Sequence, residues 1–161
     1  MAHTPILVVC LGNICRSPLA EGLLRSKLNF TKFKVDSAGT YGGHAGSQPD
    51  KRSMAVALKN GLDISSQRSR KFIIEDFNQF DIIYAMDDSN FKDLMSLTKT
   101  SEHQSKIRKM LDEAFPGESL EVPDPYHGGQ RGFETVYKML DRATSVVAEK
   151  LQNPTNQQDD L

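Results

Sequence analysis

The 161-residue sequence contains only two cysteines, Cys10 and Cys15, which lie five residues apart. A fold held together by disulfides would use more cysteines, spread more widely along the chain. A structural zinc site is also disfavoured, because the C-x4-C spacing lacks a second ligand pair and the four histidines are scattered. The scarcity of cysteine therefore predicts a protein of the reducing cytoplasm that needs neither disulfides nor a bound metal.

The sequence also lacks an excess of charge and a long apolar run. Its 20 Lys and Arg residues are balanced by 21 Asp and Glu residues, so the net charge of −1 creates no field that would attract nucleic acid or an anionic membrane. The longest early apolar run, Ile6 to Leu11, is too short for a signal-peptide core or a membrane span. We therefore expect a cytoplasmic protein that binds neither nucleic acid nor membrane and is a monomer or associates weakly with itself.

What remains is the composition of an ordinary globular domain. Hydrophobic residues make up 38% of the chain and charged residues 25%, and a chain of this length can bury a core without a cofactor or disulfides. We expect a single domain over residues 1–151. The polar segment 152–161 is expected to be a disordered tail.

Apolar runs with strand character alternate along the chain with segments of helical spacing. Ser17 is expected to be the N-cap of the first helix and Pro18 its first residue. This alternation predicts an α/β fold, with a parallel sheet covered by helices on both faces. The predicted strands are 5–10, 32–38 and 80–86. The segment 106–114 fits either a strand or a helix, and topology alone favours a strand. The predicted helices start at 17, cover 49–60 and 133–151, and follow residues 87–89, which supply the helix caps; residues 115–132 are predicted to be a loop.

The segment 10–17 joins the first strand to the first helix, at the edge of a parallel sheet where function gathers. Backbone N–H groups in such a turn can converge on one anion, and they would favour the thiolate of Cys10. Arg16 offers a planar fork that can hold two oxygens of a phosphoryl group, and Ser17 could donate to the sulfur. Cys10 is therefore the predicted nucleophile. The residues expected to bind the phosphate are Leu11, Gly12, Asn13, Ile14, Cys15 and Ser17.

The Cys and Arg of this segment and the Asp of the later loop each have a plainer interpretation. A bare C-x5-R spacing arises by chance in roughly one such chain in ten, so the prediction depends on the position of this spacing directly after a strand. A cysteinyl-phosphate route also needs an acid, and Asp124 is the candidate because Pro123 and Pro125 restrict the backbone on both sides of it. A proline-rich surface turn would look the same in the sequence.

Three separate segments carry a resemblance to a known family. They are CLGNICRSPLAE at 10–21, DSAGT at 36–40 and DPY at 124–126. With these motifs the chain resembles the low molecular weight protein tyrosine phosphatases over about residues 5 to 151.

The resemblance implies a three-layer, flavodoxin-like fold with a four-stranded parallel sheet. It implies Cys10 as nucleophile, Arg16 as phosphate clamp and Asp124 as general acid, with no metal or other cofactor. It gives Asn13, Ser17 and Ser37 a hydrogen-bonding role that supports the loop. The family often has an aromatic wall residue where this chain has Gly43, and Tyr41 could take the place of that aromatic side chain. Many members have a His where this chain has Gln67.

The expected function is hydrolysis of phosphotyrosine in protein substrates. Tyr41, His44, Tyr126 and His127 are the predicted walls of the substrate cleft. Similar loops also serve protein-arginine phosphatases, which typically carry Thr where this chain has Ile14, and arsenate reductases, which need thiols beyond the loop. A phosphopeptide-binding module without catalysis is the alternative from another class.

Cys15 has two interpretations. It is either a small packing residue in the loop or a resolving thiol, which would trap an oxidised Cys10 as a disulfide before irreversible oxidation. The family resemblance supports the second.

Overall fold

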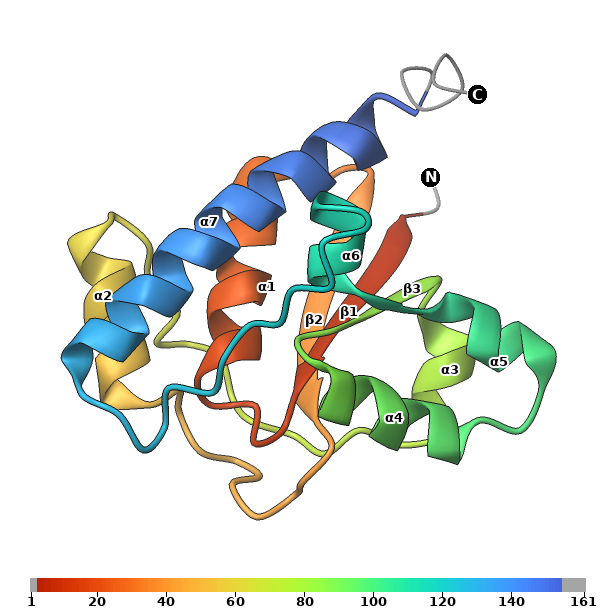
Figure 1. The fold of residues 1–161 in the computed structure, drawn as a ribbon, viewed down its shortest axis with the longest axis horizontal. Helices are drawn as coiled ribbons and strands as arrows, with labels where there is room; N and C mark the ends of the chain where they lie inside the picture. Colours follow the sequence, from red (N-terminus) through yellow and green to blue (C-terminus); the bar gives the residue numbers. More distant parts are fainter. Residues whose placement is uncertain (1–2, 155–161) are drawn as a thin grey trace.

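An all-parallel β-sheet of four strands forms the middle layer of the computed structural model, which describes residues 3–154 (Figure 1). The strand order is β2-β1-β3-β4, so the first strand is central. The fold class predicted from the sequence is confirmed. The strands are β1 (Thr4–Cys10), β2 (Phe33–Gly39), β3 (Ile82–Ala85) and β4 (Ile107–Lys109); the helices are α1 (Arg16–Lys27), α2 (Lys51–Lys59), α3 (Asp76–Gln79), α4 (Asp88–Leu97), α5 (Ser101–Lys106), α6 (Met110–Ala114) and α7 (Gln130–Gln152).

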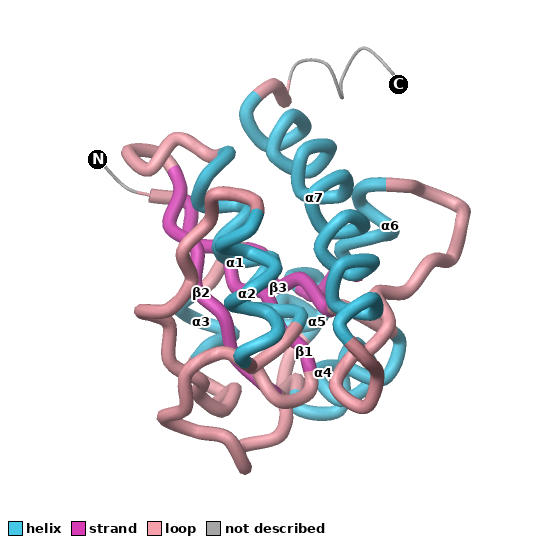
Figure 2. Tube along the Cα trace, turned by 90° about the vertical axis from the view of Figure 1, so that its left-hand side faces the viewer, coloured by secondary structure: helices cyan, strands magenta, loops and turns pink. Residues whose placement is uncertain are grey.

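Helices cover both faces of the sheet. One layer consists of α1, α2, α6 and α7, and the opposite layer of α3, α4 and α5 (Figure 1). Figure 2 views the molecule from the side of α2 and α7, with the strands behind them. The long helix α7 packs along α1 and also contacts α2 and α6, which makes it the outer support of the first layer.

The apolar run of β1 follows from this burial on two sides. Ile6 and Val8 point into the larger core, beneath α1 and α7, whereas Leu7 and Val9 point into the smaller core, which includes Phe77 and Leu94. All of these side chains are fully buried. A strand buried on both faces needs no polar alternation, so the sequence shows a continuous run.

The start of α1 differs from the sequence prediction. The helix begins at Arg16, with Cys15 in the N-cap position and no side-chain capping bond. Ser17 is therefore not the N-cap, and Pro18 lies in the third helical position. The preference of serine for caps is overridden here because the Ser17 hydroxyl bonds within the preceding loop instead.

The uncertain segment 106–114 divides between the two predicted alternatives. Its first part is the short edge strand β4, which pairs with β3, and its second part is α6. The short helices α3 and α5 were not predicted from the sequence. The C-terminal helix begins three residues earlier than predicted, at Gln130, and includes Gln152, while residues 155–161 of the predicted tail lie outside the described residues.

Burial in α1 yields a prediction for stability. Leu24 in α1 is fully buried, whereas Leu58 in α2 is 68% exposed. We expect Leu24→Ala to lower the free energy of unfolding by about 2–5 kcal/mol, because the cavity cannot collapse fully. Urea denaturation measures the change. The matched variant Leu58→Ala should stay within about 0.5 kcal/mol of the parent, and equal losses in both would contradict the assigned core.

Candidate active site

The loop between β1 and α1 has its carbonyl groups turned outward. The Cys10 and Leu11 carbonyls accept from the amides of Thr40 and Tyr41, at 3.0 and 2.8 Å. The Gly12 carbonyl accepts from Ser69 Oγ, the Ile14 carbonyl from the Asp50 amide, and the Cys15 carbonyl from Ser53 Oγ. Within residues 3–154, none of the N–H groups of residues 11–15 donates to the protein. A concave row of free amide donors at a helix N-terminus is an anion-binding arrangement.

Asn13 holds the turn in this shape. Its φ is 56°, a left-handed conformation that Asn tolerates better than most residues. The Oδ1 atom accepts from the amide of Arg70 at 3.0 Å, and Nδ2 donates to Ser17 Oγ at 2.8 Å and to Ser37 Oγ at 2.9 Å. Because Asn13 is 2% exposed, these bonds are made without competition from water.

The hydrogen-bond network assigns the proton of Ser17. Both Nδ2 protons of Asn13 are engaged, and the Ser37 hydroxyl donates to Glu21 Oε1 at 2.7 Å. Ser17 Oγ therefore accepts from Asn13 and keeps its own proton for its other neighbour, Cys10 Sγ at 3.1 Å. The Ser17 hydroxyl is thus a hydrogen-bond donor aimed at the sulfur of Cys10.

Arg16 lies buried beside the nucleophile candidate. Its side chain is 2% exposed, and Nη1 donates to Asp87 Oδ2 at 2.6 Å and to the Val122 carbonyl at 3.0 Å. Burial would lower the pKa of Arg16, but the neighbouring Cys10 and Asp87 outweigh burial and raise it. The guanidinium is thus held at a fixed angle by a carboxylate and a carbonyl on one nitrogen.

Asp124 occupies the opposite wall. Its Oδ2 lies 3.8 Å from Arg16 Nη2, too long for a direct hydrogen bond, and its side chain is 40% exposed. Its Oδ1 accepts from the amide of Tyr126 at 3.0 Å, which closes the turn of the loop. The acid candidate therefore faces both the cradle and solvent.

These groups line one pocket of about 170 Å³. Tyr41, His44 and Tyr126 form its aromatic rim. The centroid of the His44 ring lies 6.0 Å from that of Tyr41 and 6.2 Å from that of Tyr126. Asn13, Ser17 and Ser37 lie behind the loop and support it instead of lining the pocket. The lining residues are Cys10, Leu11, Gly12, Ile14, Cys15, Arg16, Tyr41, His44, Asp124, Tyr126 and His127.

Gly43 explains the position of Tyr41. A Cβ atom on Gly43 would lie 2.1 Å from the Tyr41 ring, so the ring occupies the space that a side chain at residue 43 would need. Tyr41 remains 56% exposed at the rim. The aromatic wall that Gly43 lacks is thus supplied from two residues earlier.

The two cysteines differ in environment. Cys15 is buried, and burial, together with the nearby Asp50 and Cys10, raises its pKa to about 12. Cys15 is therefore a neutral thiol at physiological pH and a poor nucleophile. Of the two, only Cys10 has a hydroxyl donor at hydrogen-bonding distance from its sulfur within residues 3–154.

Three contributors to the site were missed by the sequence analysis. Asp87 caps α4 through Oδ1, at 2.7 Å from the Asn90 amide, while its Oδ2 pairs with Arg16. The capping role was predicted from the sequence, but the pairing was not. Gly39 lies against the loop, and Arg70 reaches Asn13 through its amide. Gly39 ends β2 and Asp87 follows β3, at the functional edge of the sheet, which is the one signal that the sequence offered. Arg70 lies in the loop before α3 and had no such signal.

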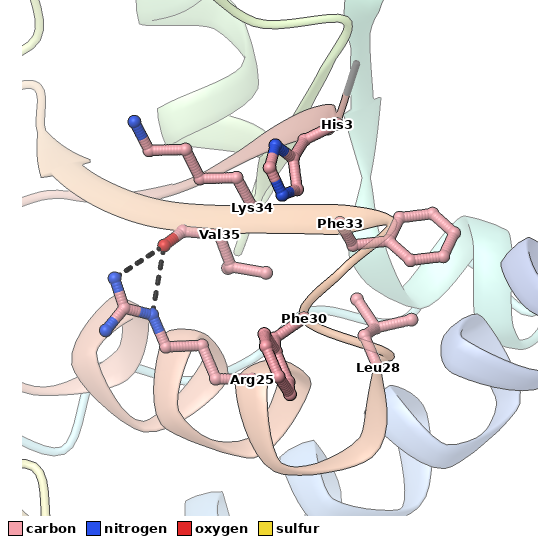
Figure 3. A pocket seen from close by; sticks show the side chains of 7 residues that line it. All are labelled: His3, Arg25, Leu28, Phe30, Phe33, Lys34 and Val35. Carbon is pink, nitrogen blue, oxygen red and sulfur yellow. Dashed lines mark hydrogen bonds between the residues drawn. The ribbon is translucent and has the colours of Figure 1, made fainter. Parts of the chain in front are cut away.

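A second pocket, of about 290 Å³, lies between α1 and β2 (Figure 3). Arg25 borders it and donates two hydrogen bonds to the Val35 carbonyl, at 2.9 and 3.1 Å. Phe30 and Phe33 supply apolar surface. Among residues 3–154 its lining contains no thiol or carboxylate, so it does not resemble the first pocket chemically.

Within residues 3–154, no group of three or more His, Cys, Asp or Glu side chains could hold a metal ion. None of the helices in this part of the chain is long and apolar enough to cross a membrane.

Comparison with known proteins identifies the family. The sequence pattern of the family described as "Low molecular weight phosphotyrosine protein phosphatase" matches residues 5–157. The chain belongs to this family. A low molecular weight phosphotyrosine protein phosphatase of Schizosaccharomyces pombe is 39% identical over 140 residues, which cover 84% of this chain and 88% of the relative. The family and the enzyme class expected from the sequence are thus confirmed.

Solved structures of the family have the same fold. A protein tyrosine phosphatase from Entamoeba histolytica, with Hepes in its active site, has a TM-score of 0.87 and 37% identity, covering 94% of this chain and 99% of that one. Vibrio vulnificus Wzb in complex with benzylphosphonate has a TM-score of 0.82 and 28% identity, covering 92% and 99%.

The packing of Gly39 yields a second prediction. A Cβ atom there would lie 2.7 Å from the Leu11 carbonyl oxygen and 3.1 Å from the Asn13 amide, so the loop backbone would have to move. We expect Gly39→Ala to cost about 1–3 kcal/mol of stability and to lower phosphatase activity at least about tenfold. Aryl phosphate hydrolysis measures the second effect. Gly132→Ala, inside α7 with 3.7 Å to its nearest neighbour, should leave activity unchanged; a similar loss there would refute the argument.

Proposed function

We propose that the protein is a metal-independent protein tyrosine phosphatase that forms a cysteinyl-phosphate intermediate. The observation that carries the proposal is the single pocket of about 170 Å³ in which Cys10, Arg16 and Asp124 meet. Cys10 and Arg16 flank one loop, whereas Asp124 is 108 residues further along the chain than Arg16 (124 − 16). The family supports phosphotyrosine hydrolysis as the reaction.

In the first step the Cys10 thiolate attacks phosphorus, an S–P bond forms and the P–O bond to the leaving group breaks. The leaving oxygen takes a proton from Asp124. The free amides of the loop and the Arg16 guanidinium hold the phosphoryl oxygens during the transfer, where charge spreads over them. Asp87 fixes the angle of that guanidinium.

In the second step Asp124, now a carboxylate, takes a proton from water. The water oxygen attacks phosphorus, the S–P bond breaks and phosphate leaves. Cys10 returns as a thiolate, which the Ser17 hydroxyl stabilises through the contact at 3.1 Å. Atoms and electrons balance without a metal or an external acid.

The pocket rim favours a flat aryl group. Tyr41, His44 and Tyr126 enclose the opening, and Ile14 adds an apolar surface at the edge of the cradle. The Vibrio vulnificus relative was solved in complex with benzylphosphonate, a phosphonate that carries an aromatic group, and this supports an aryl phosphate as the substrate. The proposed partners are proteins that carry phosphotyrosine.

Other reactions known for such loops fit less well. Ile14 has no hydroxyl with which to orient a phosphoramidate, which argues against phosphoarginine. Arsenate reduction needs further thiols to pass the oxidising equivalent outward, and no cysteine follows Cys15.

Hydrolysis of an aryl phosphate in excess chelator tests the proposal. We expect turnover of the parent protein, none for Cys10→Ser, and a decrease on the order of 10² to 10⁴ for Asp124→Asn that is largest for poor leaving groups. The inactive Cys10→Ser variant should still bind phosphate, because the amides and Arg16 remain. A parent protein that binds phosphate without turnover would instead be a binding module.

The substrate preference is tested separately: phosphotyrosine peptides should exceed phosphoarginine and phosphoserine peptides at least about tenfold in kcat/KM.

We also propose that Cys15 is a resolving thiol. Peroxide oxidises the Cys10 thiolate to a sulfenic acid; the Cys15 thiolate then attacks that sulfur, hydroxide leaves and a disulfide forms. Burial and the nearby Asp50 raise the pKa of the Cys15 thiol, so its thiolate fraction and the rate of closure should increase with pH across the physiological range.

Recovery after peroxide treatment tests this role. Dithiol should restore the parent protein and not Cys15→Ser, because overoxidation of Cys10 competes with closure. The protected fraction of the parent, measured from recovered activity, should grow between about pH 6.5 and pH 8. Equal recovery in both proteins would exclude the resolving role.

A further inference from the structure

Arg52, in the first turn of α2, binds the backbone of the loop that carries Asp124. Its Nη1 donates to the Gly128 carbonyl and its Nη2 to the Tyr126 carbonyl, each at 2.8 Å. Tyr126 in turn donates its amide to Asp124 Oδ1 at 3.0 Å. One guanidinium therefore holds the residue that orients the acid candidate.

The guanidinium is itself fixed from the other side. Asp50 accepts from Nε and Nη2 through its two carboxylate oxygens, each at 3.1 Å. Burial raises the pKa of Asp50, but the hydrogen bonds from Arg52 outweigh burial and lower it. The Arg52 guanidinium carbon also lies 4.4 Å from the centroid of the Phe133 ring, at the start of α7. This anchoring keeps Arg52 in one conformation.

The same helix turn holds the phosphate loop. The Asp50 amide donates to the Ile14 carbonyl at 2.8 Å, and Ser53 Oγ donates to the Cys15 carbonyl at 3.2 Å. The first turn of α2 thus contacts the loop of the nucleophile and the loop of the acid. Arg16 reaches the acid loop through the Val122 carbonyl at 3.0 Å, but it lies 3.8 Å from Asp124 itself, which is too long for a hydrogen bond that would orient the carboxylate.

We propose that Arg52 is a positioning residue that fixes Asp124 at the correct distance from the leaving oxygen. The proposal rests on the proposed function, in which Asp124 is the general acid. Proton transfer requires a heavy-atom separation within about 2.6–3.2 Å, so a loop that shifts by an ångström loses the acid even when it keeps its fold. A lysine cannot replace Arg52, because a single ammonium group cannot reach two carbonyls and a carboxylate in the same plane.

Steady-state kinetics with aryl phosphates of different leaving-group pKa tests the proposal. The variants are Arg52→Met, Arg52→Lys and Asp124→Asn, with Lys51→Met as control. Lys51 is the exposed preceding residue, so its substitution changes the net charge equally. For both Arg52 variants we expect kcat/KM to fall about tenfold with phenyl-type leaving groups and less than about threefold with nitrophenyl groups. Lys51→Met should resemble the parent, and a selective loss there would overturn the proposal.

Two further measurements separate positioning from a general loss of structure. Inhibition by inorganic phosphate should change less than about twofold in the Arg52 variants, because the cradle is untouched. In the Asp124→Asn background, Arg52→Met should cause no further loss beyond about twofold, since the group through which it acts is gone. Arg52→Lys provides the same comparisons if Arg52→Met does not fold.

The outcomes distinguish this proposal from the proposed function. If Asp124→Asn slows all leaving groups equally, the acid assignment fails and the positioning role falls with it. If Asp124→Asn is selective but the Arg52 variants are not, only the positioning role is wrong. Weaker phosphate inhibition in the Arg52 variants would show that Arg52 supports the cradle, which also overturns the proposal.

Discussion

The outward anchoring of the loop carbonyls between β1 and α1 is the constraint on which the rest of the site depends. A peptide unit points its N–H and C=O in opposite directions, so fixing the carbonyls outward turns the amides inward. The left-handed Asn13 and its bonds to Ser17 and Ser37 make this reversal possible within a few residues. Gly39 allows the neighbouring strand to approach the turned backbone. In the proposed function, anion binding is therefore mainly a property of the backbone, and side chains supply the chemistry.

The sequence predicted those parts of the site that are local in the chain. Cys10, Arg16 and Ser17 lie on one strand–loop–helix unit, where residue type and spacing determine what the turn can do. The strands β1 and β3 were equally accessible, because burial on both faces leaves apolar runs such as that of β1. The edge strand β2 was predicted from a weaker alternation that stops at Gly39. The rim residues followed from the rule that loops meet at the carboxyl edge of a parallel sheet, together with the family resemblance.

Contacts between distant segments could not be predicted in this way. Arg16 and Asp87 are 71 residues apart, and the local pattern around Asp87 indicates only a helix cap, a role that one of its oxygens also fills. Arg52 is 74 residues from Tyr126, and in the sequence it is an ordinary charged helix residue. The prediction that Ser17 caps the first helix was wrong for the converse reason: its hydroxyl bonds to Asn13 and Cys10, and these tertiary contacts outweigh the local preference of serine for helix caps. The edge strand β4 is too short for a periodic signal.

The proposed mechanism places opposite demands on its two principal loops. The Cys10 thiolate of this mechanism needs hydrogen-bond donors fixed around it, and the nucleophile loop is accordingly bonded through the buried Asn13. Asp124 must exchange its proton with water in each cycle, so it cannot be enclosed in the same way, and its side chain is 40% exposed. An exposed carboxylate between two prolines has few side-chain partners that could orient it without excluding water. Backbone carbonyls held from behind by a guanidinium satisfy both conditions, because they fix the loop while leaving the carboxylate itself open to solvent.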